Sequence, residues 1–168
     1  MTRLAIALAL TALALLAPAA TAVEPLVCRA GAIQQALIDA GRLTAEDVGF
    51  GVVVDLVRCG DITNDGDADG LFTLASGGTA GDTRFGVFRG RKDGAPGALV
   101  LWRPGYKVGV ARRNRRSFDV LQPHYEADDA NCCPSSYRQR RFTWAGGHFE
   151  RAKKARRLKT APRRFYRP

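Results

Sequence analysis

After residue 50 the chain is a succession of short apolar segments, each bounded by glycine, proline, asparagine or aspartate. Valine-rich and aromatic segments of this length are typical of β-strands, and the residues between them favour tight turns. The pattern predicts strands over 50–59, 71–75, 84–89, 98–103, 106–112, 117–126 and 137–144, with a continuation at 148–151. Pro104-Gly105 predicts a tight hairpin turn, and Pro123 limits its strand to an edge or a bend.

One helix is expected before these strands. Within 30–43, apolar residues recur at helical spacing at Ile33, Ala36, Leu37 and Ala40, and Gly41 supplies a stop. We therefore predict an α+β domain over 23–150, with a short N-terminal helix and a mainly antiparallel meander sheet of about six or seven strands.

The first 22 residues have the form of a secretory signal peptide. Arg3 precedes an apolar run over 4–16, and small residues follow as far as Ala22. This run is shorter than the roughly 20 apolar residues that span a bilayer. The residues directly before Cys28 do not form a lipoprotein signal. We expect cleavage after Ala22 and a released protein that is secreted or periplasmic.

The four cysteines are expected to form disulfides. Cys28, Cys59, Cys132 and Cys133 all follow the signal, and an even number of cysteines in a small exported protein favours disulfides. A redox pair or a zinc site is disfavoured because the chain has no C-x-x-C motif. A bond within the 132–133 doublet would close a strained ring. Cys28 and Cys59 are therefore each expected to pair with one member of the doublet.

An aspartate-rich loop over 61–69 is the most specific motif. Oxygen-bearing side chains fall at positions 1, 3, 5 and 9, a glycine falls at position 6, and the carbonyl of position 7 is a further ligand. The pattern predicts a calcium site formed by Asp61, Thr63, Asp65, Asp67 and Asp69. An EF-hand is disfavoured because position 12 is Phe72, not glutamate. The alternative is a plain turn, although four acids this close repel one another without a cation.

Two resemblances follow from these residues. The stretch 59–72 resembles the calcium loop of FG-GAP and VCBS-type repeats, which carry D-x-[DNT]-x-D-G-x-x-D between two strands. Those families build propellers from many copies, so one copy implies neither that architecture nor its adhesion role. With Cys132-Cys133-Pro134-Ser135 and the aromatic segment 142–149, the chain over 50–150 also resembles uncharacterised bacterial envelope proteins of the LppP/LprE lipoprotein type. That resemblance implies no chemistry.

No motif identifies a catalytic site. The two histidines, His124 and His148, are in no recognisable triad, and the glycine loop over 76–82 lacks the lysine and helix of a phosphate-binding loop. A carboxylate pair for glycoside hydrolysis cannot be assigned from sequence. A non-catalytic protein is therefore favoured over an enzyme.

Charge is divided unevenly along the chain. Residues 23–93 hold 7 basic and 11 acidic residues (net −4), whereas residues 94–168 hold 18 basic and 5 acidic residues (net +13). Basic clusters lie at 112–116 and 138–141. Residues 151–168 contain no acid and predict a disordered tail that binds polyanions. Its predicted binding residues are Arg151, Lys153, Lys154, Arg156, Arg157, Lys159, Arg163 and Arg164.

The function expected from these features is an exported, non-catalytic binding or structural protein of the bacterial envelope or the extracellular space. Calcium is the expected stabilising cofactor, and anionic envelope polymers or lipid head groups are the expected partners of the tail. Two alternatives stay open: a secreted hydrolase supported by calcium, and a general polyanion or nucleic-acid binder.

Overall fold

The computed structural model describes residues 23–166; the predicted signal peptide, residues 1–22, lies outside this range. The chain begins with the 3₁₀ turn η1 (Leu26–Cys28) and two helices, α1 (Ala30–Asp39) and α2 (Ala45–Gly49). Nine strands follow: β1 (Val53–Gly60), β2 (Asp69–Ala75), β3 (Asp82–Gly90), β4 (Pro96–Pro104), β5 (Gly109–Asn114), β6 (Ser117–His124), β7 (Ser136–Ala145), β8 (His148–Arg151) and β9 (Arg156–Leu158). A second 3₁₀ turn, η2 (Arg163–Phe165), ends the described chain.

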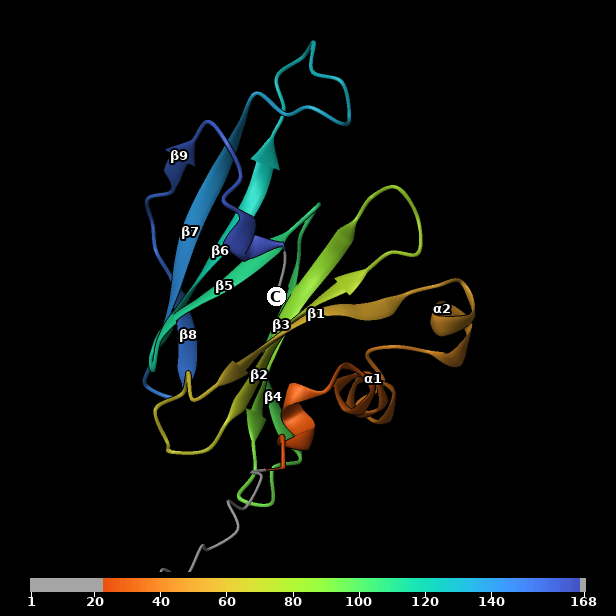
Figure 1. Ribbon diagram of the computed structural model, residues 1–168, viewed down its shortest axis with the longest axis vertical. Coiled ribbons are helices and arrows are strands. Elements are labelled where there is room, and N and C mark those ends of the chain that lie inside the picture. Colours follow the sequence, from red (N-terminus) through yellow and green to blue (C-terminus); the bar gives the residue numbers. More distant parts are fainter. Residues whose placement is uncertain (1–22, 167–168) are drawn as a thin grey trace, which may run out of the picture.

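The strands form two antiparallel sheets rather than the single meander that we expected (Figure 1). Sheet A is a four-stranded meander in the order β1-β2-β3-β4. Sheet B has the order β5-β6-β7-β8, and β9 pairs with β7 on the same side as β8. The mostly β architecture with one short helical segment agrees with the predicted class in its coarse features. The predicted number of sheets is wrong.

The chain passes from sheet A to sheet B in the segment that follows β4. Sequence analysis predicted a hairpin across Pro104-Gly105, but β4 pairs with β3, and β5 pairs with β6. The backbone N–H of Lys107 donates to the carbonyl of Ala80, and that of Val108 donates to the carbonyl of Asp82. These bonds direct the chain past the start of β3 and into the second sheet, so the hairpin prediction is wrong.

Alternating residues of β2 divide the interior into two layers. Phe72 and Leu74 face helix α1, where Ile33 and Leu37, one turn apart, supply the buried side of the helix. Leu71 faces sheet B and packs in a core between the sheets that includes Phe118 and Phe142. The fold is therefore layered: helix α1 covers one face of sheet A, and sheet B covers the other (Figure 1).

The segment after β8 is ordered, contrary to the predicted disordered tail. Strand β9 pairs with β7, and the Phe165 side chain of η2 is fully buried against Ala111 and Leu121. The hydroxyl of Tyr166 donates to the carbonyl of Lys107 at 3.0 Å. The error arose because this segment is short of apolar residues, whereas strand pairing and the buried Phe165 ring together hold it on sheet B.

The cysteine pairing also differs from our prediction. Cys28 is bonded to Cys59, and Cys132 is bonded to Cys133. The first bond joins η1 to the end of β1 across a sequence separation of 31, with Cα atoms 5.1 Å apart. Closing a loop of this size stabilises a fold by roughly 3–4 kcal/mol in the chain-entropy model.

No helix within residues 23–166 is long and apolar enough to cross a membrane.

Candidate functional site

The predicted calcium loop joins β1 to β2 and is organised around Asp69. This carboxylate is fully buried and accepts hydrogen bonds from the backbone N–H groups of Ile62 (2.7 Å), Thr63 (2.8 Å) and Gly90 (3.1 Å). The Thr63 hydroxyl lies 3.4 Å from its second oxygen. Burial raises the pKa of Asp69, and these hydrogen bonds oppose the rise. Both carboxylate oxygens therefore already have donors from the chain.

Two other acids of the loop, Asp61 and Asp65, also accept hydrogen bonds from the chain. Asp61 accepts hydrogen bonds from the backbone N–H groups of Asp65 and Gly66, and Asp65 accepts from the Asp67 N–H and the Arg89 guanidinium. Across residues 23–166, no three His, Cys, Asp or Glu side chains gather in a group that could hold a metal ion. Calcium binding by this loop stays a prediction.

The basic residues predicted to bind polyanions have different surroundings in the structure. Arg157 pairs with Glu126 at 2.8 Å, and the backbone carbonyl of Arg164 accepts a hydrogen bond from Arg58. Arg151 instead lies at the end of β8, where it lines a cleft that the sequence did not reveal. The remaining predicted residues are exposed along the segment that follows: Lys153, Lys154, Arg156, Lys159 and Arg163.

This cleft lies between the two sheets and has a volume of about 430 Å³. It is lined by residues of both sheets. Sheet A contributes Phe85, Arg103 and Pro104, and sheet B contributes Val120, Gln122, Arg138, Arg140, Phe142 and Arg151. Four arginines thus surround an apolar floor, and no carboxylate is among the lining residues.

The register of β6 and β7 explains why these arginines converge. Val120 lies opposite Arg140, and Gln122 lies opposite Arg138, so these four side chains share one face of sheet B. Phe118 and Phe142 continue the same face into the core between the sheets. The inner face of sheet B is therefore apolar at one end and basic at the other.

The cleft arginines differ from those on the outer face of sheet B in their partners. On the outer face, Arg113 and Arg141 lie 3.6 and 3.3 Å from the buried carboxylate of Asp119. Among residues 23–166, none of the four cleft arginines forms an ion pair with a carboxylate. The charge of the cleft is consequently left uncompensated by the described chain.

Two of the cleft arginines contact groups other than carboxylates. One guanidinium nitrogen of Arg140 donates to the carbonyls of Lys153 (2.9 Å) and Ala152 (3.3 Å). Arg138 lies 3.2 Å from the Nε2 atom of His124. These contacts orient the guanidinium groups without neutralising them, so the remaining N–H donors can bind an anion.

Sequence analysis noted the basic cluster over 138–141 but did not assign it to a site. The Arg-x-Arg spacing within a predicted strand was the available signal, because residues two apart share one face. Arg103 gave no comparable signal, since it lies on the other sheet. Comparison of the chain with models of protein families, with curated proteins and with solved structures finds no match in any of the three.

Proposed function

We propose that this is an exported, non-catalytic binding protein that holds the anionic groups of an envelope component in the cleft between its two sheets. The observation that carries this proposal is the set of four cleft arginines without a carboxylate partner among the described residues. Guanidinium groups bind phosphate and carboxylate oxygens through paired N–H donors, and they retain their charge at any physiological pH. Phosphate or carboxylate groups are therefore the expected ligand chemistry.

The shape of the cleft supports a ligand larger than a single small ion. Its volume of about 430 Å³ falls within the range of ligand pockets. The floor formed by Phe85, Val120 and Phe142 lowers the local dielectric, which strengthens attraction between the arginines and an anion. An uncharged portion of the ligand would lie over this floor.

The segment after β8 extends the basic surface beyond the cleft. Because Arg140 bonds to the carbonyls of Ala152 and Lys153, the exposed Lys153 lies beside the rim, and Lys154 follows it. A ligand with repeated charges would contact both the cleft and this segment. The prediction that basic residues after β8 bind polyanions is thereby retained as part of the proposal, with the cleft as its centre.

Affinity measured against salt concentration tests the proposal. The two probes are linear polyphosphate and vesicles containing phosphatidylglycerol, which present similar phosphate groups on a polymer and on a lipid surface. We expect saturable binding of at least one probe and a steep loss of affinity as salt rises, because each contact displaces condensed counterions. Tighter binding of one probe shows whether the bound phosphate groups belong to a polymer or to a lipid surface. Failure of both probes to bind, or binding that is insensitive to salt, would contradict the proposal.

A further inference from the structure

A second, smaller hollow lies on the outer face of sheet B and has a volume of about 160 Å³. Pro123 and Tyr137 lie opposite each other on β6 and β7, one register step from the Gln122–Arg138 pair of the cleft. Further along the chain, Tyr125, Cys132, Pro134 and Tyr166 complete the wall together with Lys107. The two hollows therefore lie at the same end of sheet B, on opposite faces.

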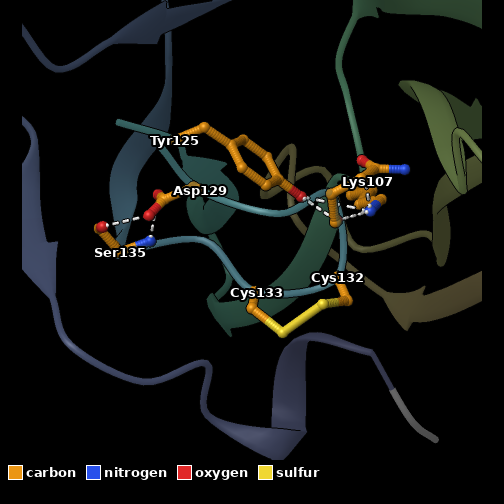
Figure 2. The surroundings of a disulfide bond; sticks show 7 residues. Lys107, Tyr125, Asp129, Cys132, Cys133 and Ser135 are labelled. Atoms are coloured by element: carbon orange, nitrogen blue, oxygen red, sulfur yellow. Dashed lines mark hydrogen bonds between the residues drawn. A yellow bond between two sulfur atoms is a disulfide. The ribbon is translucent and has the colours of Figure 1, made fainter. Parts of the chain in front are cut away.

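The walls of this hollow are fixed by hydrogen bonds. Figure 2 shows Lys107 and Tyr125 directed toward each other beside the loop that carries Cys132. The Lys107 ammonium donates to the Tyr125 hydroxyl at 3.2 Å and to both the backbone carbonyl and the side-chain oxygen of Asn131. The Tyr125 hydroxyl donates to the Asn131 carbonyl at 2.8 Å.

The loop itself is closed by a second set of bonds. Asp129 accepts from the backbone N–H and the hydroxyl of Ser135, each at 2.7 Å (Figure 2). It also accepts from the N–H of Glu126. Hydrogen bonds from Glu126 and Ser135 also lower the pKa of Asp129, so the carboxylate remains charged at neutral pH. The wall of the hollow is thus held in place before any ligand arrives, which reduces the entropy lost on binding.

The Lys107 ammonium keeps its charge but has no N–H donor left to offer a ligand. An ammonium group has three N–H donors, and those of Lys107 are matched by its three oxygen partners. The same ammonium lies 5.7 Å from the centre of the Tyr125 ring, where the face of the ring partly offsets its charge. A ligand in this hollow therefore gains no hydrogen bond from a charged group, which favours a neutral ligand here over the anionic ligand of the cleft.

The polar groups that remain available are hydroxyl groups. Within residues 23–166, the Tyr137 hydroxyl has no hydrogen-bond partner. The Tyr166 hydroxyl donates to Lys107 but still has free acceptor lone pairs. Between them lie aromatic and proline faces. A ligand that matches this pattern has a flat apolar face and hydroxyl groups at its edge.

From these observations we infer that the hollow lined by Tyr125, Tyr137 and Tyr166 binds one neutral sugar ring. The C–H face of such a ring packs on tyrosine and proline, and its hydroxyl groups exchange hydrogen bonds with the free tyrosine hydroxyl groups. The volume of about 160 Å³ lies below the range of pockets for drug-sized ligands, so the hollow has room for one ring of a sugar chain and not for a larger ligand. A proline side chain would fill the apolar part but would leave the Tyr137 hydroxyl without a partner.

The test uses the full mature chain and two neutral probes, a tetramer of N-acetylglucosamine and a tetramer of glucose. Binding is followed by NMR through the tyrosine ring resonances. Tyr137→Ala removes a ring face, Tyr137→Phe removes only the hydroxyl, and Phe50→Ala is the matched control because Phe50 is 73% exposed and lies outside the hollow. We expect Tyr137→Ala to weaken sugar binding about tenfold, Tyr137→Phe about threefold, and Phe50→Ala not at all.

Several outcomes would overturn the inference. The first is that neither sugar binds saturably. The second is that both Tyr137 variants bind sugar with unchanged affinity. The third is that a proline-rich peptide shifts the same tyrosine resonances when neither sugar does. If Tyr137→Ala does not fold, Tyr137→Phe decides alone. Arg140→Gln, which alters the cleft on the other face, is expected to leave sugar binding unchanged, so this test is independent of the proposed anion binding.

Discussion

Arg140 and Arg141 are adjacent in β7 but lie on opposite faces of sheet B. Arg141 donates to the buried Asp119 carboxylate, whereas Arg140 donates only to the carbonyls of Ala152 and Lys153 among the described residues. The difference arises because successive side chains of a β-strand point to opposite faces of the sheet. Substitutions one residue apart therefore separate an arginine that stabilises the fold from one that is available to a ligand.

Asp69→Ala is expected to lower the free energy of unfolding by about 3 kcal/mol. The substitution leaves the N–H groups of Ile62, Thr63 and Gly90 without the carboxylate that accepts their hydrogen bonds. Urea unfolding in the presence of EDTA measures the effect of the hydrogen bonds alone. Asp67→Ala, in the same loop, is the control and is expected to cost less than about 0.5 kcal/mol. Equal costs for the two variants would contradict the central role of Asp69.

Phe165→Ala is expected to cost about 3–4 kcal/mol, because the ring is fully buried between η2 and sheet B. Lys159→Ala, in the exposed part of the same segment, serves as the control and should leave the melting temperature almost unchanged. Thermal unfolding measures both variants. If the segment after β8 were a disordered tail, neither substitution would change the melting temperature.

The Asp82 carboxyl is expected to make stability depend on pH. Burial raises its pKa, the nearby Thr73 hydroxyl opposes the rise, and the charge of Asp55 adds to it. A pKa that is higher in the folded state means that stability is greatest at low pH and is lost as pH rises through the folded-state pKa. Asp82→Asn, which stays neutral, should therefore be more stable than the parent chain at pH 7.

The same comparison at low pH supplies the control for Asp82. Below the ordinary aspartate pKa of 3.8, the parent carboxyl is protonated in both states, and the advantage of Asp82→Asn should disappear. Urea unfolding at pH 3 and pH 7 measures the difference. Asp128→Asn, at an exposed position, should have no effect at either pH. A constant difference across this range would show that Asp82 does not titrate as described.

Peptide mapping without reduction is expected to show Cys28 joined to Cys59. Trypsin cleaves after Arg29 and after Arg58, which places these cysteines on separate peptides, whereas Cys132 and Cys133 share the peptide 117–138. The pairing in the structure predicts one linked pair of peptides and no link between either peptide and 117–138. A link from Cys28 or Cys59 to 117–138 would instead support the pairing first expected from the sequence.

The approximate positions of β1 to β8 followed from the sequence, but β9 and the assignment of the strands to two sheets did not. The pattern placed one strand at 84–89 and another at 137–144, close to β3 (Asp82–Gly90) and β7 (Ser136–Ala145). Alternation of side chains identifies a strand without identifying its neighbour. The separation after β4 depends on backbone bonds from Lys107 and Val108 to residues more than twenty positions earlier, which no local pattern encodes.

The candidate site was harder to predict than the fold. Strand β7 carries Arg138 and Arg140 on one face and Arg141 on the other, so arginine composition alone does not show which face is buried. The cleft also requires Arg103 from the other sheet. The predicted aspartate loop was easier to find because its residues are contiguous, but Asp61, Asp65 and Asp69 each accept hydrogen bonds from backbone N–H groups of the chain.

Binding of linear polyphosphate by paired variants tests the central claim most directly. The variant with both Arg138→Gln and Arg140→Gln removes two cleft charges, and Arg141→Gln removes one charge from the outer face of the same strand. At fixed low salt, we predict that the double variant binds about 30- to 100-fold more weakly, and that Arg141→Gln, once confirmed to be folded, binds within about twofold of the parent chain. Unchanged affinity in the double variant, or an equal loss in Arg141→Gln, would contradict the assignment of the cleft as the anion site.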